Sequence, residues 1–415
     1  MPSSRNIIVA GAGIGGMTAA LTLAQSGFRV TLLEQAERLQ ETGAGVQLSP
    51  NASRILIALG LGPRLQPHVL VPQAVAIRTA TGGRLARIPL GERAERRYGA
   101  PYWSIHRGDL QAVLLEAVRA SPDIALRLGV RVEDYAVHAK GISVACHRGA
   151  ETVDEHCIAL VGADGLWSVL RNRLGHDAPP AFARRTAWRA LVPAEKVEPE
   201  FRSDEVQLWL GPSAHLVHYP VKAGALINIV AIVNDRWTQP GWSAAGERDE
   251  LLAHYSPWHW AEPARALLAL PERWLKWALC DLPPLQRWGE GPVTLLGDAA
   301  HPMLPFLAQG AAMAIEDAAV LASSLARQPD RLPSGMRHYE RSRRRRTAKV
   351  QRAARRNGRV YHLAAGEAWM RNLFLRLAGG KMLLRRYDWL YDWHTTLTAG
   401  ATGLDNLPAP RADEQ

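Results

Sequence analysis

Residues 6–34 read NIIVAGAGIGGMTAALTLAQSGFRVTLLE, and this stretch decides the fold of the chain. It begins with a short apolar run at 7–10, passes through a glycine turn and continues into a segment of helical composition at 17–26. A second apolar run follows and ends in Glu34. An apolar strand, a tight turn, a helix and a second strand form the start of a parallel βαβ unit. We therefore predict an α/β chain that opens with such a unit.

The glycines of this turn fit the binding of a dinucleotide. Gly11, Gly13 and Gly16 form the pattern GxGxxG, with Gly15 inside it. The first glycine permits the tight turn, the second lets the backbone approach a pyrophosphate, and the third lets the helix pack closely on the strand. The helix start supplies free N–H groups for an anion, and Glu34 is placed to accept hydrogen bonds from ribose hydroxyls. The pattern predicts dinucleotide binding but does not separate FAD from NAD.

The positive charge of the chain is concentrated in one segment. The formal net charge is +11, and residues 327–359 hold 13 Lys and Arg against 2 Asp and Glu, so the remaining 37 basic and 37 acidic residues cancel. The segment has helical composition and contains an arginine-rich run at 341–346. We expect a solvated face or a subunit contact there and no nucleic acid, because no aromatic interleaving accompanies the run. A basic interaction protein that binds nucleic acid stays open as an alternative class.

Other features of the composition bound the class of protein. The scattered cysteines Cys146, Cys157 and Cys280 fit neither a disulfide framework nor a zinc site, and no cluster of His, Cys, Asp or Glu has metal spacing. No apolar run approaches the roughly 20 residues that span a bilayer, and the N-terminus lacks a signal-peptide pattern. We expect a cytoplasmic protein with no metal and no membrane partner. The last dozen residues are expected to be frayed.

Two later motifs separate the possible cofactors. GADG at 162–165 follows one apolar run, and GDAAHP at 297–302 follows another, shortly before a helical segment that begins at Gly310. Together with the glycine turn, and in the same order, these motifs resemble those of the flavoprotein aromatic hydroxylases of the para-hydroxybenzoate hydroxylase fold. The resemblance covers roughly residues 5–360. It implies FAD as the bound cofactor and NADH or NADPH as a transient co-substrate.

The resemblance also implies cofactor-binding roles for individual residues. The family aspartate that binds the ribityl chain of FAD is Asp298 here, and the following helix directs its N-terminus at the flavin, where it stabilises negative charge. The aspartate of the GADG motif holds the diphosphate region, and Arg107 matches a family arginine on the FAD side. The predicted cofactor-binding residues are Gly11, Gly13, Gly15, Gly16, Glu34, Gln35, Val46, Arg107, Asp164, Asp298, Gly310 and Ala311.

The residues after about position 180 predict a second domain. Strand-like runs at 187–192, 205–210, 214–221 and 226–233 are separated by turn residues, and an apolar run at 293–296 then returns to the first unit. We predict an α/β fold with a Rossmann-like FAD-binding domain, an inserted, mostly antiparallel β-sheet substrate domain and a helical C-terminal segment. The predicted boundaries are 1–72, 102–180 and 281–360 for the discontinuous FAD-binding domain, 73–101 and 181–280 for the substrate domain, and 361–415 for the helical C-terminal extension.

One branch of the family is closer than the rest. Residues 43–51, 88–91, 107–110 and 308–310 look like the salicylate, 3-hydroxybenzoate and 6-hydroxynicotinate hydroxylases. Members of that branch carry a His and a Tyr four residues apart on a substrate-domain strand.

The matching residues here are His215 and Tyr219, and strand alternation puts them on one face with His218 on the other. The resemblance implies that His215 and Tyr219 are catalytic. A phenolate is a better nucleophile than a phenol toward an electrophilic flavin hydroperoxide, so a base or a proton relay raises the rate. The alternative is a tyrosine packed in the sheet and a solvated histidine.

The predicted substrate pocket contains Gln47, Pro305 and Phe306. The 6-hydroxynicotinate enzymes have His at the positions of Gln47 and Phe306, and the 3-hydroxybenzoate enzymes favour Gln at that of Pro305. Because an apolar pocket suits a benzenoid ring better than a pyridone, a salicylate-like acid is the first expectation.

These residues together predict an enzyme. We expect a FAD-dependent monooxygenase, a monomer or homodimer, that hydroxylates a small phenolic aromatic acid, salicylate-like or hydroxybenzoate-like, with NAD(P)H and O2. Three alternatives stay open: a 6-hydroxynicotinate-type hydroxylase, a flavoprotein oxidoreductase of the same fold that acts on a larger aromatic metabolite, and a nicotinamide dehydrogenase without flavin.

Overall fold

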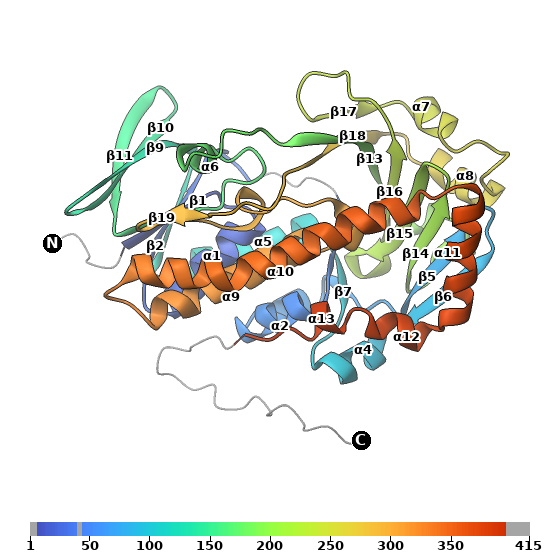
Figure 1. Ribbon diagram of the computed structural model, residues 1–415, viewed down its shortest axis with the longest axis horizontal. Helices are drawn as coiled ribbons and strands as arrows, with labels where there is room; N and C mark the ends of the chain where they lie inside the picture. Colours follow the sequence, from blue (N-terminus) through green and yellow to red (C-terminus); the bar gives the residue numbers. More distant parts are fainter. Residues whose placement is uncertain (1–5, 40–43, 396–415) are drawn as a thin grey trace.

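A computed structural model describes residues 6–39 and 44–395 (Figure 1). The last dozen residues, whose fraying the sequence predicts, lie outside the described residues, as do Gly43 of the branch motif and the end of the predicted C-terminal extension. Two sheets lie at opposite ends of the molecule, and the long helix α10 (Leu332–Tyr361) runs along both of them (Figure 1). Within the described chain, no helix is both long enough and apolar enough to cross a bilayer.

A six-strand sheet contains the βαβ unit. Its order is β19-β20-β12-β1-β2-β8, and all neighbouring strands are parallel except β19 and β20. Helix α1 (Ile14–Gln25) packs against it, and α9 (Gly310–Ala326) packs against α1, where Thr22 Oγ1 donates a hydrogen bond of 3.1 Å to the carbonyl of Ala318. The strands are β1 (Asn6–Ala10), β2 (Arg29–Glu34), β8 (Ile124–Leu128), β12 (Ala159–Gly162), β19 (Gly289–Glu290) and β20 (Val293–Leu295).

An eight-strand sheet forms the other half of the molecule. Its order is β17-β18-β13-β16-β15-β14-β5-β6, and only the β14–β5 pair is parallel. The mostly antiparallel sheet predicted from the sequence is therefore confirmed. The strands are β5 (Ala74–Thr79), β6 (Arg84–Pro89), β13 (Ala181–Pro193), β14 (Glu205–Gly211), β15 (Ala214–Val221), β16 (Leu226–Asn234), β17 (Ser243–Gly246) and β18 (Trp274–Asp281).

Two small sheets and several helices complete the described chain. The β3-β7-β4 sheet lies beside the larger sheet, where the Gly45 amide donates 2.7 Å to Asn228 Oδ1 of β16. The β11-β10-β9 sheet packs beside the six-strand sheet. Their strands are β3 (Gly45–Leu48), β4 (Val69–Leu70), β7 (Trp103–His106), β9 (Val130–His138), β10 (Gly141–Arg148) and β11 (Glu151–Cys157). The other helices of the described chain are α2 (Pro50–Ala58), α3 (Gly62–Leu65), α4 (Gly91–Tyr98), α5 (Arg107–Ala120), α6 (Val169–Arg173), α7 (Arg248–Ala253), α8 (Glu262–Ala269), α11 (Ala365–Ala378), α12 (Gly380–Arg385) and α13 (Asp388–Tyr391).

The α/β fold predicted from the sequence is confirmed, and the boundaries of its three parts stay a prediction. Strands of the six-strand sheet come from both sides of the segment that forms most of the larger sheet. The larger sheet takes two further strands, β5 and β6, from earlier in the chain. This interleaving brings both sheets against one cavity.

Candidate active site

A cavity of about 450 Å³ lies between the two sheets. One of its walls comes from the glycine turn, the 296–298 turn and the start of α9. The opposite wall comes from strands β5, β6, β14, β15 and β16 of the larger sheet. The described end of the chain contributes Tyr361, the last residue of α10, with Tyr387 just before α13 and Tyr391 at its end. Residues from very different parts of the sequence therefore share one enclosed space.

Two helix N-termini open onto this cavity. Gly13 caps α1 and Gln309 caps α9, and neither helix has a side-chain cap or an acidic residue in its first turn. A Cβ atom placed on Gly13 or Gly310 would meet nothing within 4 Å. Uncapped N–H groups beside open space form a site for negative charge. The arrangement fits the pyrophosphate of a dinucleotide at α1 and a ring that gains negative charge at α9.

The remaining glycines of the turn are required by close packing. Gly11 has φ +101°, and a Cβ there would lie 2.4 Å from the Ala163 carbonyl oxygen. A Cβ on Gly16 would lie 1.8 Å from the carbonyl oxygen of Gly11. At Gly15 it would lie 3.0 Å from the Ala314 side chain of α9. These three glycines let the turn after β12, the end of β1, α1 and α9 approach each other, and among the glycines of the turn Gly13 alone is left open to a ligand.

Glu34 lies in a second cavity of about 590 Å³ at the end of β2, next to the glycine turn. Its carboxylate accepts hydrogen bonds from the amides of Ala12 (2.8 Å) and Ala36 (2.9 Å). Those bonds hold the carboxylate at the strand end, where ribose hydroxyls would meet it. Gln35, predicted with it, is exposed and lines neither cavity, so its cofactor role stays a prediction.

Two of the three charged residues predicted to bind the cofactor line the main cavity, and the third, Asp164, lies between the lining residues Ala163 and Gly165. Arg107 and Asp298 line it, and Arg107 forms no ion pair with any described residue. Asp298 is exposed and lines the cavity, and desolvation there raises the pKa of its carboxyl, although the charges of His301 and Arg107 oppose the rise. Asp164 Oδ2 accepts from the Leu170 amide (3.1 Å), while its buried Oδ1 has no partner in the described chain. An orphaned acceptor, an unpaired guanidinium and two uncapped helices fit FAD.

The opposite wall carries the predicted catalytic pair. His215, Val217 and Tyr219 lie on the cavity face of β15. His218 lies on the other face, where it accepts a hydrogen bond of 3.2 Å from Trp209 Nε1. Tyr219 lies so close to β3 that a Cβ on Gly45 would be 2.7 Å from its hydroxyl.

The chemistry of both side chains is set by burial. Burial raises the pKa of Tyr219 to about 12, although Arg189 and Gln47 oppose the rise. Burial, His362 and Arg185 together hold the pKa of His215 well below its ordinary value. The His215 Nδ1 atom lies 2.7 Å from Nε2 of His362, the residue that caps the C-terminus of α10. At neutral pH the cavity therefore faces a neutral phenol and a neutral imidazole.

The predicted substrate-pocket residues also meet here. Gln47 Oε1 accepts a hydrogen bond of 2.6 Å from Tyr102, and Val46 lies next to it in the lining. Pro305 and Phe306 line the cavity, and the ring centroid of Phe306 is 5.5 Å from that of His215. The pocket around the predicted catalytic pair is thus largely apolar and aromatic.

Sequence reasoning missed Arg189, a cavity-lining residue of β13. Its guanidinium lies 5.4 Å from the Trp277 ring centroid, forms no ion pair with a described residue, and has a buried Nε without a partner. Burial and the nearby Arg107 lower its pKa. An unpaired arginine in an apolar pocket is suited to a carboxylate. The available signal was a single charged residue inside the apolar strand run 187–192.

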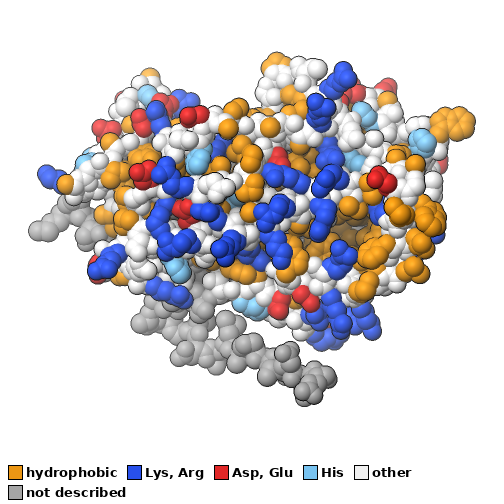
Figure 2. Space-filling model, in the orientation of Figure 1, with side chains coloured by type: hydrophobic (Ala, Val, Ile, Leu, Met, Phe, Trp, Pro, Cys, Tyr) orange, Lys and Arg blue, Asp and Glu red, His pale blue; other side chains and the backbone are white. Residues whose placement is uncertain are grey.

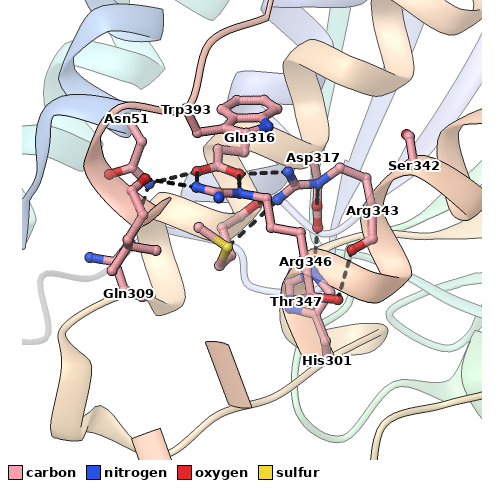
Figure 3. Close-up of polar contacts among 12 residues, drawn as sticks. Asn51, His301, Gln309, Glu316, Asp317, Ser342, Arg343, Arg346, Thr347 and Trp393 are labelled. Carbon is pink, nitrogen blue, oxygen red and sulfur yellow. Dashed lines mark hydrogen bonds and ion pairs between the residues drawn. The ribbon is translucent and has the colours of Figure 1, made fainter. Parts of the chain in front are cut away.

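The expectation that the arginine-rich run 341–346 forms a solvated face is wrong for two of its members. Figure 2 shows Lys and Arg side chains gathered along α10, and Arg341 and Arg345 are indeed exposed. Arg343, however, is 1% exposed and bonds Glu316 (2.5 Å) and Asp317 (2.6 Å) of α9. Arg346 binds the same Glu316 (2.7 Å), as Figure 3 shows. Two buried carboxylates in an apolar helix require such partners.

This buried network supports the wall formed by the glycine turn, the 296–298 turn and the start of α9, which we call the cofactor wall. Asp317 Oδ2 accepts hydrogen bonds from the Gly297 amide (3.0 Å) and from His301 (2.5 Å). Glu316 accepts from Asn51 (2.6 Å), which also bonds Gln309 at the start of α9 (Figure 3). Burial alone would raise the pKa of Asp317, but His301 and Arg343 hold it below its ordinary value. His301 is therefore a structural residue of this turn.

The arrangement of the cavity defines a class of protein. A dinucleotide site that faces a wall with a histidine and a tyrosine able to hydrogen bond a phenol is the architecture of a flavoprotein aromatic monooxygenase. Residues 5–354 match the family model described as FAD binding domain. The chain is 39% identical over 393 residues to 3-hydroxybenzoate 6-hydroxylase 1 of Aquipseudomonas alcaligenes, covering 94% of this chain and 96% of the relative. It is 37% identical over 338 residues to 6-hydroxynicotinate 3-monooxygenase of Pseudomonas fluorescens, covering 78% and 83%.

A solved structure agrees with these relatives. A salicylate hydroxylase substrate complex matches with TM-score 0.79 and 28% identity, over 95% of this chain and 97% of that chain. The chain belongs to the FAD-binding-domain family and is a flavoprotein aromatic monooxygenase with FAD as its cofactor.

Proposed function

We propose that this monooxygenase hydroxylates a small phenolic acid of the hydroxybenzoate type, with NADH or NADPH as reductant and O2 as oxidant. One observation carries the proposal. His215 and Tyr219 share the face of β15 that lines the cavity, and the two uncapped helix N-termini open onto the same cavity. The names of the relatives, which include a 3-hydroxybenzoate 6-hydroxylase, support the same substrate class.

The cofactor wall would bind FAD through backbone and carboxylate groups. The amides near Gly13 would receive the pyrophosphate, Glu34 the ribose, and Asp298 the ribityl hydroxyls, while the start of α9 would face the flavin. Arg107 neutralises charge at the same place. Bound and reduced FAD supplies the activation of O2, and the protein supplies orientation and a dry cavity.

The opposite wall, formed by strands of the larger sheet and called here the substrate wall, would bind the acid and ionise its phenol. Arg189 is the candidate for the ring carboxylate, because its Nε is buried without a partner and its guanidinium has no described ionic partner. Tyr219 hydrogen bonds the phenol, and neutral His215 accepts its proton. Apolar side chains of β14, β15 and β16 and the Phe306 ring enclose the benzenoid ring: Val206, Leu208, Val217, Val230 and Ile232.

The alternatives differ in pocket chemistry. Gln47 and Phe306 line the cavity where the 6-hydroxynicotinate enzymes carry His, and their replacement favours a benzenoid ring over a pyridone. A larger aromatic metabolite fits the lining less well, because the single unpaired guanidinium of this wall, Arg189, suits a small ring that carries one carboxylate. The buried, unpaired cysteines Cys146 and Cys157 suit the reducing cytoplasm, where we place the enzyme as a monomer or homodimer.

One screen tests the proposal. The purified protein should be yellow, and 3-hydroxybenzoate, salicylate, 4-hydroxybenzoate and 6-hydroxynicotinate should be compared as stimulants of NADH and NADPH oxidation. We expect a monohydroxybenzoate to stimulate best and to gain one oxygen atom by mass. Preference for 6-hydroxynicotinate would favour the alternative, and a colourless protein would contradict a flavoenzyme. Salt-sensitive DNA binding would favour the interaction class.

A further inference from the structure

The hydrogen bond between His215 and His362 links the cavity to the protein surface. His215 is 1% exposed and lines the cavity. His362 follows the last turn of α10 and is partly exposed. Its second ring nitrogen, Nδ1, lies 2.9 Å from Oδ1 of Asn234, the last residue of β16. Two imidazoles thus span the distance between substrate wall and solvent.

The contacts of Asn234, at the outer end of this hydrogen-bond series, determine which ring nitrogen of each histidine carries a hydrogen. Arg185 Nε contacts the same Asn234 atom at 3.2 Å. A guanidinium can only donate a hydrogen bond, so the contacted atom must be the amide oxygen. That oxygen cannot donate, so His362 Nδ1 must carry the hydrogen of their contact. In the neutral ring, His362 Nε2 is then the unprotonated nitrogen.

The tautomer of His362 in turn fixes the tautomer of His215 at the cavity. Because His362 Nε2 accepts, His215 Nδ1 must donate across their 2.7 Å contact. His215 therefore keeps its lone pair on Nε2, which has no hydrogen-bond partner in the described chain. This is the tautomer in which His215 can take a proton from a ligand in the cavity.

The surroundings favour the neutral form of both rings. Burial, with Arg185 and Arg371, lowers the pKa of His362 to about 3. Arg185 comes from β13 and Arg371 from α11, while Arg359 lies on α10 and acts on Arg185. No described carboxylate forms an ion pair with any of these arginines. A proton that reaches His362 is therefore not held there and leaves for solvent.

We propose that His362 is the outer member of a two-imidazole relay that carries the phenolic proton of the substrate from the cavity to solvent. The inference rests on the proposed function and deepens it. The substrate O–H bond breaks as His215 Nε2–H forms, and His215 Nδ1–H breaks as His362 Nε2–H forms. The Nδ1 proton of His362 then leaves its hydrogen bond to Asn234 Oδ1 and passes to water at this partly exposed ring. No electrons are transferred in these steps. The reverse hops protonate the product before release.

A glutamine at position 362 separates relay from positioning. His362→Gln keeps an acceptor for His215 Nδ1–H, so it preserves ring orientation, but an amide cannot pass a proton onward. His362→Ala removes both functions and leaves space for added imidazole. His259→Gln is the matched control, because His259 is exposed and lies outside the cavity.

The experiment uses FAD-loaded enzyme and 3-hydroxybenzoate without NADH. Rapid mixing records the phenolate absorbance and, with a pH indicator in weak buffer, the released proton. In the parent and His259→Gln both signals should rise together. In His362→Gln both should slow by about 10²-fold, while FAD content and equilibrium affinity for the acid stay within about twofold of the parent. Imidazole should accelerate both signals in His362→Ala.

The outcomes separate the two proposals. Equal rates in His362→Gln and the parent overturn the relay, as does a parent that hydroxylates the acid without releasing a proton on binding. In both cases the proposed function stands. A parent that hydroxylates none of the screened acids overturns the proposed function, and the relay falls with it.

Discussion

The two walls of the cavity present different kinds of groups to their proposed ligands. The cofactor wall presents mainly backbone: the open glycines Gly13 and Gly310 and the uncapped starts of two helices. The substrate wall presents side chains from adjacent strands, among them His215 and Tyr219. Backbone recognition depends on where the chain runs, whereas side-chain recognition depends on single residues.

This difference separates what is common to a family from what is particular to a member. A backbone site is disturbed by adding atoms, because any Cβ occupies ligand space. A side-chain site is disturbed by removing functional groups. Substitutions on the two walls should therefore fail in opposite ways, one in cofactor retention and the other in the fate of oxygen.

The largest effect is expected on the substrate wall. His215→Gln and Tyr219→Phe should retain FAD but form product about 10²–10⁴-fold more slowly, because the phenol is no longer readied for attack. NADH oxidation should fall less, so hydrogen peroxide should accumulate. The measurement is the ratio of peroxide to hydroxylated acid.

His218→Ala controls for damage to the strand, since it removes an imidazole from the opposite face of β15. It should lower stability by unpairing Trp209 and leave the peroxide ratio unchanged. If His218→Ala uncouples the reaction while the other two variants do not, the assigned roles of this strand face are wrong.

The next effect lies behind the cofactor wall. Arg343→Met leaves two buried carboxylates without their main partner and should lower the free energy of unfolding by about 3–5 kcal/mol. Arg345→Gln, two residues away and exposed, should change it by less than about 0.5 kcal/mol. Urea unfolding of both variants measures the difference. Equal stabilities would mean that the network does not support α9.

A smaller effect should follow from one added methyl group. Gly13→Ala should fold normally, since a Cβ there meets nothing within 4 Å, yet it should weaken FAD binding by roughly 100-fold, or about 2.7 kcal/mol. Thermal melting of the apoprotein and flavin titration measure the two properties separately. Unchanged FAD affinity would place the pyrophosphate elsewhere.

The hydrogen-bond series from Asn234 through His362 to His215 predicts that a negative charge at position 234 impairs coupling. Asn234→Asp places a carboxylate beside His362 and should raise its pKa. A protonated His362 must donate from Nε2, so His215 Nδ1 has to accept and its own proton moves to Nε2, toward the cavity. Coupling should fall by about tenfold at neutral pH, within the range of lost general-base catalysis. Asn234→Ser, which keeps an oxygen without charge, should lie between the variant and the parent.

The smallest effect concerns acid stability. His362 has a pKa of about 3 when folded, against about 6.5 when unfolded, so the unfolded state binds more protons between these values. Its contribution to stability is present above pH 6.5 and is lost as the pH falls toward 3. His362→Gln should therefore flatten the loss of stability between pH 6 and 4, followed by unfolding at each pH. A slope identical to that of His259→Gln would contradict the neutral assignment.

The cofactor wall was largely predictable from the sequence. Its glycines act within a few residues of each other, so spacing alone fixes the turn. The strand at 214–221 was also predicted, and with it the common face of His215 and Tyr219. Local spacing is sufficient to predict the glycine turn, and local alternation is sufficient to predict the strand face.

The parts that sequence reasoning missed depend on contacts between distant segments. Arg343 meets Glu316 across 27 positions, and His362 meets His215 across 147. Tyr387 and Tyr391 reach the cavity from the described end of the chain. Nothing in local composition distinguishes Arg343 from the exposed Arg345, because helical phase relative to a partner helix decides which arginine is buried.

Helix α10 sets the distance and the rotation between two residues with fixed positions. Arg343 is anchored in the buried network, and His362 follows 19 positions later, about 28 Å along the axis. A residue inserted between them would turn His362 by about 100° and shift it by about 1.5 Å. The outer face of this helix can therefore change its charges freely over generations, while the number of residues in the interval cannot change by even one.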